Sequence, residues 1–371
     1  MVDPSGFSVR PPKGPEEVKS LWWPWMQSLG WNRAEEDFTT HWHSSGGNYI
    51  VLTHKDPSSP SSSSSPSPPE NAIDQAKPKP KAKPVGIILP LAYPNNTGWL
   101  GFFVVDAAYR GTGAGGGLLF RAALDDLARR GARRVGLDGV REQVATYGRR
   151  GFVERGRVKL MQVRAQAQAT SGEVGELAAV QQEDEEEDLG GMAAAVVVKT
   201  LDEVRPPALV AADERVTGLR RTGLWTEELL AGRGDAWGFA AVVGGEESGG
   251  GGGGDGRGGD ERVLGFVLVR SCQHGYRVGP LYAPSRGWAR ALLLRAMQKI
   301  ESFGAAAAGK SLVAEVWGEN PVAVETFEGL GWEYSGMDYS RMWLNGEETE
   351  AQKKGGLAEK EVFAWFDAGE G

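Results

Sequence analysis

An apolar run leads into a glycine-rich turn in the stretch Trp99-Leu100-Gly101-Phe102-Phe103-Val104-Val105-Asp106-Ala107-Ala108-Tyr109-Arg110-Gly111-Thr112-Gly113-Ala114-Gly115. The pattern predicts a strand, a turn and a helix that starts near Gly116. Glycine residues let the main chain adopt positive φ and approach a ligand closely. The first amides of a helix lack partners within it, and together with the helix dipole they attract phosphate oxygens. The stretch therefore predicts a site for a phosphate-bearing cofactor.

The spacing of these glycines leaves more than one cofactor open. Gly111-x-Gly113-x-x-Gly116 formally matches the dinucleotide-binding fingerprint, for which Asp138 lies slightly far along the chain as the acidic partner. A nucleoside-triphosphate loop requires Gly-Lys-Ser or Gly-Lys-Thr, which this turn lacks. A turn without a ligand is a further alternative, because the chain contains 54 glycine residues.

A third pattern, Arg-x-x-Gly-x-Gly, is filled by Arg110, Gly113 and Gly115. After the next strand comes a short helix that ends in Tyr147-x-x-x-Gly151-Phe152. Together these motifs resemble the coenzyme A loop and the last helix of the GNAT superfamily of N-acetyltransferases. The resemblance implies an α/β (α+β) fold, in which helices flank a mixed, mostly antiparallel sheet. It also implies that acetyl-CoA is the cosubstrate and that its acetyl group passes directly to an amine.

The resemblance assigns roles to individual residues. It places the pantetheine arm on Phe103, Val104 and Val105, and the pyrophosphate on Arg110, Gly111, Thr112, Gly113, Ala114 and Gly115. Tyr147 stands where many relatives protonate the departing thiolate, a role that suits a phenol at neutral pH. The alternative for Tyr147 is an aromatic ring packed on the sheet. Asp138 is a candidate base for the attacking amine, or equally a turn residue before Gly139.

The second half of the chain repeats the first in outline. The ending Tyr147-Gly148-Arg149-Arg150-Gly151-Phe152 aligns with Phe327-Glu328-Gly329-Leu330-Gly331-Trp332. The second half lacks Arg-x-x-Gly-x-Gly, carries Pro284 where an amide donor is needed, and has Phe327 in place of the tyrosine. It therefore resembles the divergent C-terminal domain of the tandem YitH-like GNAT group. Such a domain would close over the substrate side of the first half or carry a weak site of its own.

Composition and repeats predict a division of the chain into two domains. We expect an N-terminal GNAT domain at 1–164 with a Ser/Pro/Lys-rich disordered insertion at 56–84, an acidic linker at 165–191, a divergent GNAT-like domain at 192–345 with a glycine-rich insertion at 244–259, and a C-terminal tail at 346–371. The insertions and the linker lack the apolar content needed to build a core. Long insertions at hairpin tips add little closure entropy.

Charge and cysteine content limit the partners and the compartment. The 41 basic and 49 acidic residues give a net charge of -8, which argues against nucleic acid as a partner and mildly favours a cationic acceptor. The single Cys272 excludes an intramolecular disulfide and a cysteine-rich metal site. No apolar run approaches the roughly 20 residues that span a bilayer, and Met1–Gly6 shows no secretory pattern. We expect a cytoplasmic or nucleocytoplasmic protein with no membrane partner.

Several further candidates have plainer alternatives. The aromatic candidates for an acceptor pocket are Trp31, Trp42 and Trp99, although large aromatics lie more often in a core. Asp37 is a weak candidate base and more simply a residue that pairs on a helix surface. His41 and His43 form a His-x-His pair, but no carboxylate completes a ligand spacing, so no metal is expected.

The leading function is transfer of an acetyl group to a small-molecule or protein amine. The alternatives are a non-catalytic coenzyme A-binding or scaffold module and a dinucleotide-dependent oxidoreductase. The identity of the acceptor and the oligomeric state cannot be derived from the sequence.

Overall fold

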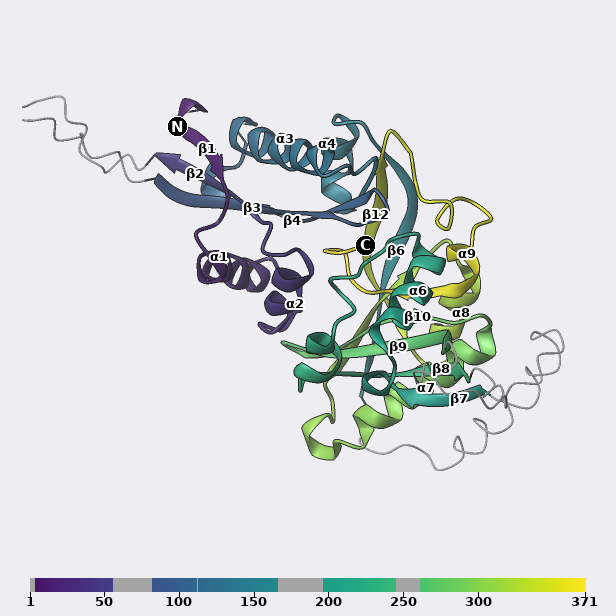
Figure 1. The fold of residues 1–371 in the computed structure, drawn as a ribbon. Coiled ribbons are helices and arrows are strands. Elements are labelled where there is room, and N and C mark those ends of the chain that lie inside the picture. The colour runs from purple at the N-terminus through teal and green to yellow at the C-terminus, as the bar shows by residue number, and fades with distance from the viewer. Residues whose placement is uncertain (1–3, 56–81, 112, 166–195, 245–260) are drawn as a thin grey trace, which may run out of the picture.

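The computed structural model describes residues 4–55, 82–111, 113–165, 196–244 and 261–371 (Figure 1). The expected insertions at 56–84 and 244–259 and the linker at 165–191 lie largely outside these residues. Residues 82–84 are an exception, because they belong to a strand that starts at Ala82.

The N-terminal half is a sheet with helices on both faces. Its strands are β1 (Phe7–Arg10), β2 (Ile50–Lys55), β3 (Ala82–Ala92), β4 (Thr97–Val105) and β5 (Arg134–Val140), and its helices are α1 (Pro15–Ser28), α2 (Asp37–Ser44), α3 (Ala114–Arg129) and α4 (Val144–Gly148). Alternate residues of β3 face opposite sides, as a strand requires. Ile87 packs with the cluster of α1 and α2, whereas Ile88 packs with that of α3.

The C-terminal half repeats this layering. Its strands are β7 (Val196–Thr200), β8 (Ala236–Val243), β9 (Arg262–Cys272), β10 (Gly275–Tyr282) and β11 (Ser311–Trp317), and its helices are α6 (Pro206–Thr217), α7 (Arg286–Glu301) and α8 (Pro321–Glu328). Phe266 packs on the side of α6, and Val267 packs on the side of α7 and α8. Short helical turns lie at η1 (Pro4–Gly6), η2 (Ala107–Tyr109), η3 (Arg141–Gln143), η4 (Leu201–Glu203), η5 (Glu228–Gly232) and η6 (Gly304–Ala306).

The two halves exchange their last strands. β6 (Phe152–Arg164) follows the N-terminal half but pairs with β11, and β12 (Glu333–Leu344) follows the C-terminal half but pairs with β5. β6 and β12 also pair with each other, so the 13 strands of the described residues form one continuous sheet across the molecule (Figure 1). The expected ranges 1–164 and 192–345 are therefore contiguous in sequence but not separate in space.

Residues 346–371, expected as a tail, are part of the fold. They contain α9 (Ala358–Glu361) and β13 (Val362–Trp365), and β13 lies in the sheet between β11 and β10. The order of the sheet is β1-β2-β3-β4-β5-β12-β6-β11-β13-β10-β9-β8-β7. Asp367 and Glu370 are buried, and the described chain ends at the centre of the molecule between the halves (Figure 1). The apolar run at 362–366 was the local sign of this strand, and sequence reasoning missed it.

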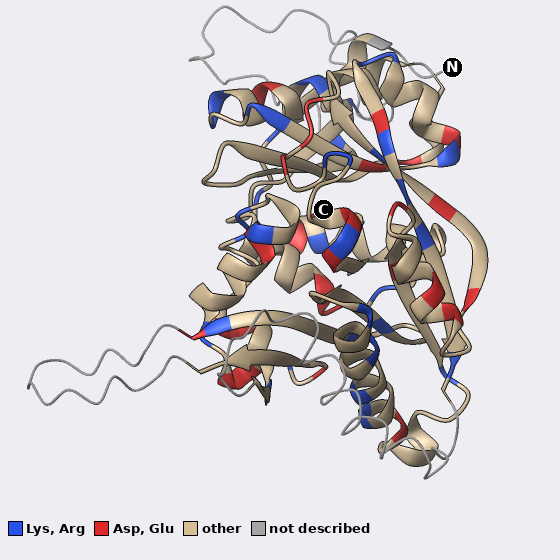
Figure 2. Cartoon of the chain, turned by 90° about the vertical axis from the view of Figure 1, so that its right-hand side faces the viewer, with Lys and Arg blue, Asp and Glu red and all other residues tan. Residues whose placement is uncertain are grey.

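Charged residues of both signs lie near this central point (Figure 2). Asp37 of α2 is buried and accepts hydrogen bonds from Arg233 at 2.9 Å and Arg270 at 3.0 Å, both in the C-terminal half. Burial raises the pKa of Asp37, but Arg270 and Arg233 outweigh burial and hold it below its usual value. Asp37 thus pairs, as expected, but inside the junction of the halves rather than on a helix surface.

The C-terminal segment takes part in the same network. Arg33 donates to Asp367 at 2.8 Å, and Nδ1 of His41 lies 2.7 Å from Oε1 of Glu370. His43 pairs with Glu228 instead, so the two histidines do not converge. Among the described residues, no group of three or more His, Cys, Asp or Glu side chains could hold a metal ion. No helix in the described part of the chain has the length and apolar content to cross a bilayer.

Candidate functional site

The central feature of the N-terminal half is the divergence of β4 and β5. The two strands pair in parallel only where Thr97–Trp99 faces Arg134–Gly136, and beyond Trp99 they separate. Phe102 has a φ of 47°, and the register of β4 against β3 shifts nearby. Such an irregularity bends a strand and redirects its side chains. A cavity of about 490 Å³ lies at the opening, and it is lined by Phe103, Val104 and Val105, the residues expected to hold the pantetheine arm.

The glycine turn forms one end of this cavity. Gly111 and Gly113 line it with φ values of 88° and 72°, and Gly113 is the residue that precedes α3. A Cβ at either position would meet no atom within 4 Å. Glycine is therefore required here by backbone conformation rather than by crowding, and the space above the turn is open.

Basic side chains stand beside the turn. A hollow next to the main cavity is lined by Gly111, Gly113, Thr146, Arg149 and Arg150. The free amides at the start of α3 and the two arginines give this hollow the donors and positive charge that bind phosphate groups. Sequence reasoning missed Arg149 and Arg150, although both were visible in the motif that ends at Phe152.

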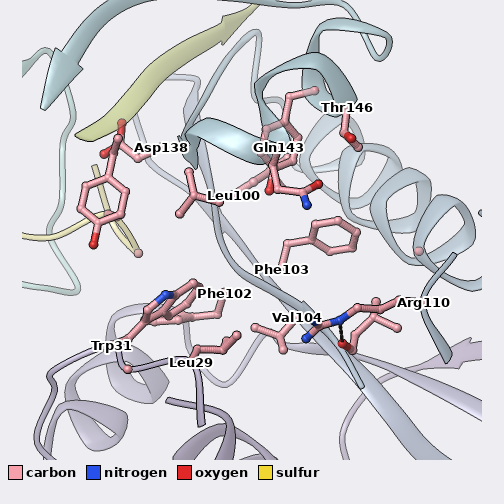
Figure 3. A pocket seen from close by; sticks show the side chains of 18 of the residues that line it. Leu29, Trp31, Leu100, Phe102, Phe103, Val104, Arg110, Asp138, Gln143 and Thr146 are labelled. Carbon is pink, nitrogen blue, oxygen red and sulfur yellow. Dashed lines mark hydrogen bonds between the residues drawn. The ribbon is translucent and has the colours of Figure 1, made fainter. Parts of the chain in front are cut away.

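Two of the predicted loop residues lie outside the cavity lining, and a third folds its side chain back. Ala114 and Gly115 do not line the cavity, and Gly115 faces Phe7 and Leu52 so closely that a Cβ would lie 2.8 Å from the Phe7 ring. Gly115 thus lets α3 pack on the sheet. The side chain of Arg110 lines the cavity but folds back, and its Nε donates to the carbonyl of Val105 at 2.6 Å (Figure 3). Thr112 lies outside the described residues.

Tyr147 projects from α4 into the cavity. Its ring packs 5.8 Å from that of Phe120 and 6.5 Å from that of Phe103. Gly139 of β5 makes room for it, since a Cβ there would lie 2.8 Å from the tyrosine ring. Burial raises the pKa of Tyr147 to about 12, although nearby Arg150 acts in the opposite direction. The phenol therefore keeps its proton throughout the neutral range.

Asp138 lies at the cavity wall, and its carboxylate is held on both oxygens. Arg341 of β12 donates from Nε to Oδ1 at 2.9 Å and from Nη2 to Oδ2 at 2.6 Å. The guanidinium of Arg341 in turn stacks 3.6 Å above Trp365 and 4.8 Å from Trp99. Burial raises the pKa of Asp138 and Arg341 opposes that shift. The pair joins the exchanged strands β5 and β12.

The far end of the cavity is built from both halves. Its walls come from the loop after α1, from β4, from β6 and from the C-terminal half (Figure 3). These residues are Leu29, Trp31, Asn32, Arg33, Leu100, Phe102, Leu160, Arg277, Val313, Met337, Tyr339, Ala368 and Gly369. Of the three predicted tryptophans, Trp31 lines the cavity. Trp42 packs against Tyr49, and Trp99 packs against Trp343 in the core.

The C-terminal half contains the same opening between strands, but the chain itself fills it. β10 and β11 pair in parallel from Gly275 to Val278 and then separate. β13 lies between them, with Leu281 opposite Ala364 on one side and Glu315 opposite Trp365 on the other. The position that is open in the N-terminal half is thus occupied by a strand.

A formal triphosphate-loop match that sequence reasoning missed also has a structural explanation. Gly304-x-x-x-x-Gly309-Lys310-Ser311 fits the Gly-x4-Gly-Lys-Ser pattern. A triphosphate loop connects a strand to a helix, whereas this segment follows helix α7 and leads into strand β11. It therefore presents no helix N-terminus to a phosphate.

Both halves of the sequence match models of known protein families. Residues 69–152 match the model of the acetyltransferase (GNAT) family, and residues 256–355 match that of an acetyltransferase (GNAT) domain. Each half of the sequence therefore contains a segment that matches a GNAT acetyltransferase domain.

Individual proteins are also similar to this chain in sequence or in structure. Holothin acyltransferase from Pseudoalteromonas sp. (strain SANK 73390) is 27% identical over 218 residues, which is 59% of this chain and 59% of the relative's own length. A putative acetyltransferase from Pyrococcus horikoshii is 17% identical with a TM-score of 0.61, over 99% of this chain and 96% of that one. A tandem GNAT protein from the clavulanic acid biosynthesis pathway is 13% identical with a TM-score of 0.51, over 91% and 98%. The structural likenesses concern the fold.

Proposed function

We propose that the N-terminal half binds acetyl-CoA and that the chain transfers the acetyl group directly to an amine. The observation that carries this proposal is the divergence of β4 and β5 beside the start of α3. Where a strand loses its neighbour, its main-chain amides and carbonyls are free to bind an extended ligand. The pantetheine arm of acetyl-CoA is such a ligand, and Phe103, Val104 and Val105 supply the free edge.

The residues around the cavity fit the rest of the cosubstrate. Gly111, Gly113, Arg149 and Arg150 surround the hollow that suits the pyrophosphate. Acetyl-CoA supplies an activated thioester, and Tyr147 holds a proton for the sulfur that leaves. The amine enters from the far end of the cavity, between the loop after α1 and the C-terminal half.

The sequence left two alternatives open, a dinucleotide-dependent oxidoreductase and a non-catalytic binding module, and each can be distinguished from this proposal. A dinucleotide-binding sheet is largely parallel, whereas among the described strands only β4–β5 and β10–β11 pair in parallel. A non-catalytic binding module would bind acetyl-CoA without turnover, so release of coenzyme A in the presence of amines distinguishes it from an enzyme.

Calorimetric titration with acetyl-CoA tests the proposal. Gly113→Glu places a negative charge and a strained backbone at the pyrophosphate end, so binding should be lost. Gly309→Glu is the matched control, because Gly309 has a φ of 73°, open space around it and a position outside the cavity. Saturable binding to the wild type and the control, but not to Gly113→Glu, supports the function. Absence of binding to the wild type refutes it.

The remaining expectations about partners stay predictions. They are a small-molecule or protein amine as acceptor, no nucleic acid or membrane partner, and a cytoplasmic location.

A further inference from the structure

The residues at the far end of the cavity, which we call the acceptor end, indicate the chemical class of the amine. Trp31, Leu160, Val313 and Met337 present apolar surface there, and Leu29, Phe102 and Trp31 gather on the side away from Thr146 (Figure 3). Burying apolar ligand surface against such walls contributes favourable free energy, whereas placing a charged group there has a high desolvation cost. The walls therefore favour an acceptor whose body is apolar.

The charges at the acceptor end do not compensate an ammonium group. Asp138 is the one acidic side chain among the described residues that line the cavity, and Arg341 engages both of its oxygens. Arg277, which also lines this end, donates to Glu315 and to the carbonyl of Asn32. Arg33 is likewise paired, with Asp367. Among the described lining residues, an ammonium group would therefore find no carboxylate without a partner, because Asp138 is already paired with Arg341.

The described lining groups also offer no free base. Burial raises the pKa of Tyr147 and of Tyr339 to about 12, so both phenols are protonated at neutral pH and cannot accept a proton. For Tyr339, Glu315 adds to the effect of burial. An alkylamine with a pKa near 10.4 is neutral in roughly one molecule in 2,500 at pH 7. Such an amine would need a base that the described lining does not supply.

We propose that the acceptor is a small, weakly basic aryl or heteroaryl amine, which is neutral at pH 7 and whose flat ring lies between Trp31 and the wall formed by Leu160 and Val313. The inference rests on the proposed function, because it names the substrate class of the same cavity. The amine lone pair forms the C–N bond with the thioester carbonyl, and the C–S bond breaks. Tyr147 protonates the sulfur and regains a proton from the nitrogen through water, so that one proton passes overall from nitrogen to sulfur.

A matched pair of amines tests the proposal. p-Toluidine and 4-methylcyclohexylamine have the same skeleton, but only the second is an ammonium ion at pH 7. We expect kcat/KM for release of coenzyme A to be at least about tenfold higher with p-toluidine at pH 7. The rate with p-toluidine should stay level between about pH 6.5 and 8.5, whereas any rate with the alkylamine should rise with pH. Calorimetry on the complex with coenzyme A should also show tighter binding of p-toluidine.

Substitution of Met337 tests the same acceptor preference independently, by changing the enzyme instead of the amine. Met337 lies at the rim of the acceptor end and is 45% exposed, so a polar residue there leaves the core intact. Met337→Glu supplies the missing carboxylate and should shift the ratio of the two kcat/KM values toward the alkylamine by about fivefold. Met337→Gln, of the same size without the charge, should leave the ratio near its wild-type value.

The outcomes separate this inference from the function on which it rests. If acetyl-CoA does not bind, the function fails and the acceptor class fails with it. If acetyl-CoA binds but the alkylamine is preferred at pH 7, the acceptor class is overturned while the function stands. Failure of every aryl amine in the presence of bound acetyl-CoA, or equal ratios for Met337→Glu and Met337→Gln, also overturns it.

Discussion

The hydroxyl group of Tyr147 is the proton donor of the proposed reaction. Tyr147→Phe keeps the ring that packs on Phe120 but removes that proton. We expect kcat to fall on the order of 100-fold, the lower end of general acid catalysis, because a thiolate leaves readily. The Kd for acetyl-CoA should stay within about twofold, since catalytic and binding contributions are separable in this way. Steady-state kinetics and calorimetry on the same preparation measure both quantities.

Tyr334→Phe provides the control for that experiment. Tyr334 is 46% exposed, lies outside the cavity lining and donates to Asp338, so loss of its hydroxyl should leave kcat unchanged. An unchanged kcat for Tyr147→Phe would remove the general acid role and leave Tyr147 as a packing residue.

A second residue-scale prediction concerns Arg341. Arg341→Met leaves the Asp138 carboxylate buried without its partner, because both side chains are fully buried. Breaking such a pair costs about 3–5 kcal/mol of unfolding free energy. Arg157→Met removes a half-exposed arginine that pairs with Glu154 and should cost about 0–1 kcal/mol. Urea denaturation of both variants measures the difference, and similar losses would contradict a structural role for the buried pair.

At the scale of secondary-structure elements, β13 bears on the number of cofactor sites that we expect. It fills the opening between β10 and β11 that corresponds to the open one between β4 and β5. We therefore expect calorimetry to give one acetyl-CoA per chain. A stoichiometry of two would show that β13 leaves its position in solution. The divergent sequence before α7 already pointed to this asymmetry, but not to the strand that enforces it.

The sequence predicted those elements whose signals are local. The glycine turn, the start of α3 and the position of Tyr147 each depend on a few neighbouring residues. Gly111, Gly113 and Tyr147 line the cavity, whereas Ala114 and Gly115 do not. The exchange of β6 and β12 could not be predicted. Alternating apolar and polar residues indicate which face of a strand is buried, but not which strand lies next to it. For the same reason the individual residues of the acceptor end were missed, except for Trp31, although closure of the second half over the substrate side was one of two alternatives for that half.

At the scale of the whole molecule, buried charges hold the halves together and make stability depend on pH. Asp37 pairs with Arg233 and Arg270 across the junction, and these arginines hold its folded-state pKa below the unfolded value. A depressed carboxyl pKa contributes stability that is fully present above the unfolded value, near 3.9, and is lost as the pH falls through the folded value. We expect the difference in unfolding free energy between wild type and Asp37→Asn to be largest at pH 7 and to shrink below about pH 4.

Urea denaturation at pH 7, 5, 4 and 3 measures this difference. Asp125→Asn is the control, because Asp125 lies exposed on α3, and its difference from wild type should stay small at every pH. A difference for Asp37→Asn that does not change with pH would show that the junction does not depend on the charge of this carboxylate.

The exchange of strands also has a consequence for how the chain reaches its native state during synthesis. Asp138 on β5 and Arg341 on β12 are 203 residues apart, so β5 has no partner on that side until the ribosome has made β12. Until then this edge of β5 stays exposed in the N-terminal half. Unpaired strand edges of this kind promote aggregation in unfinished chains. The nascent protein would depend on chaperones for longer than a protein whose domains fold one after the other.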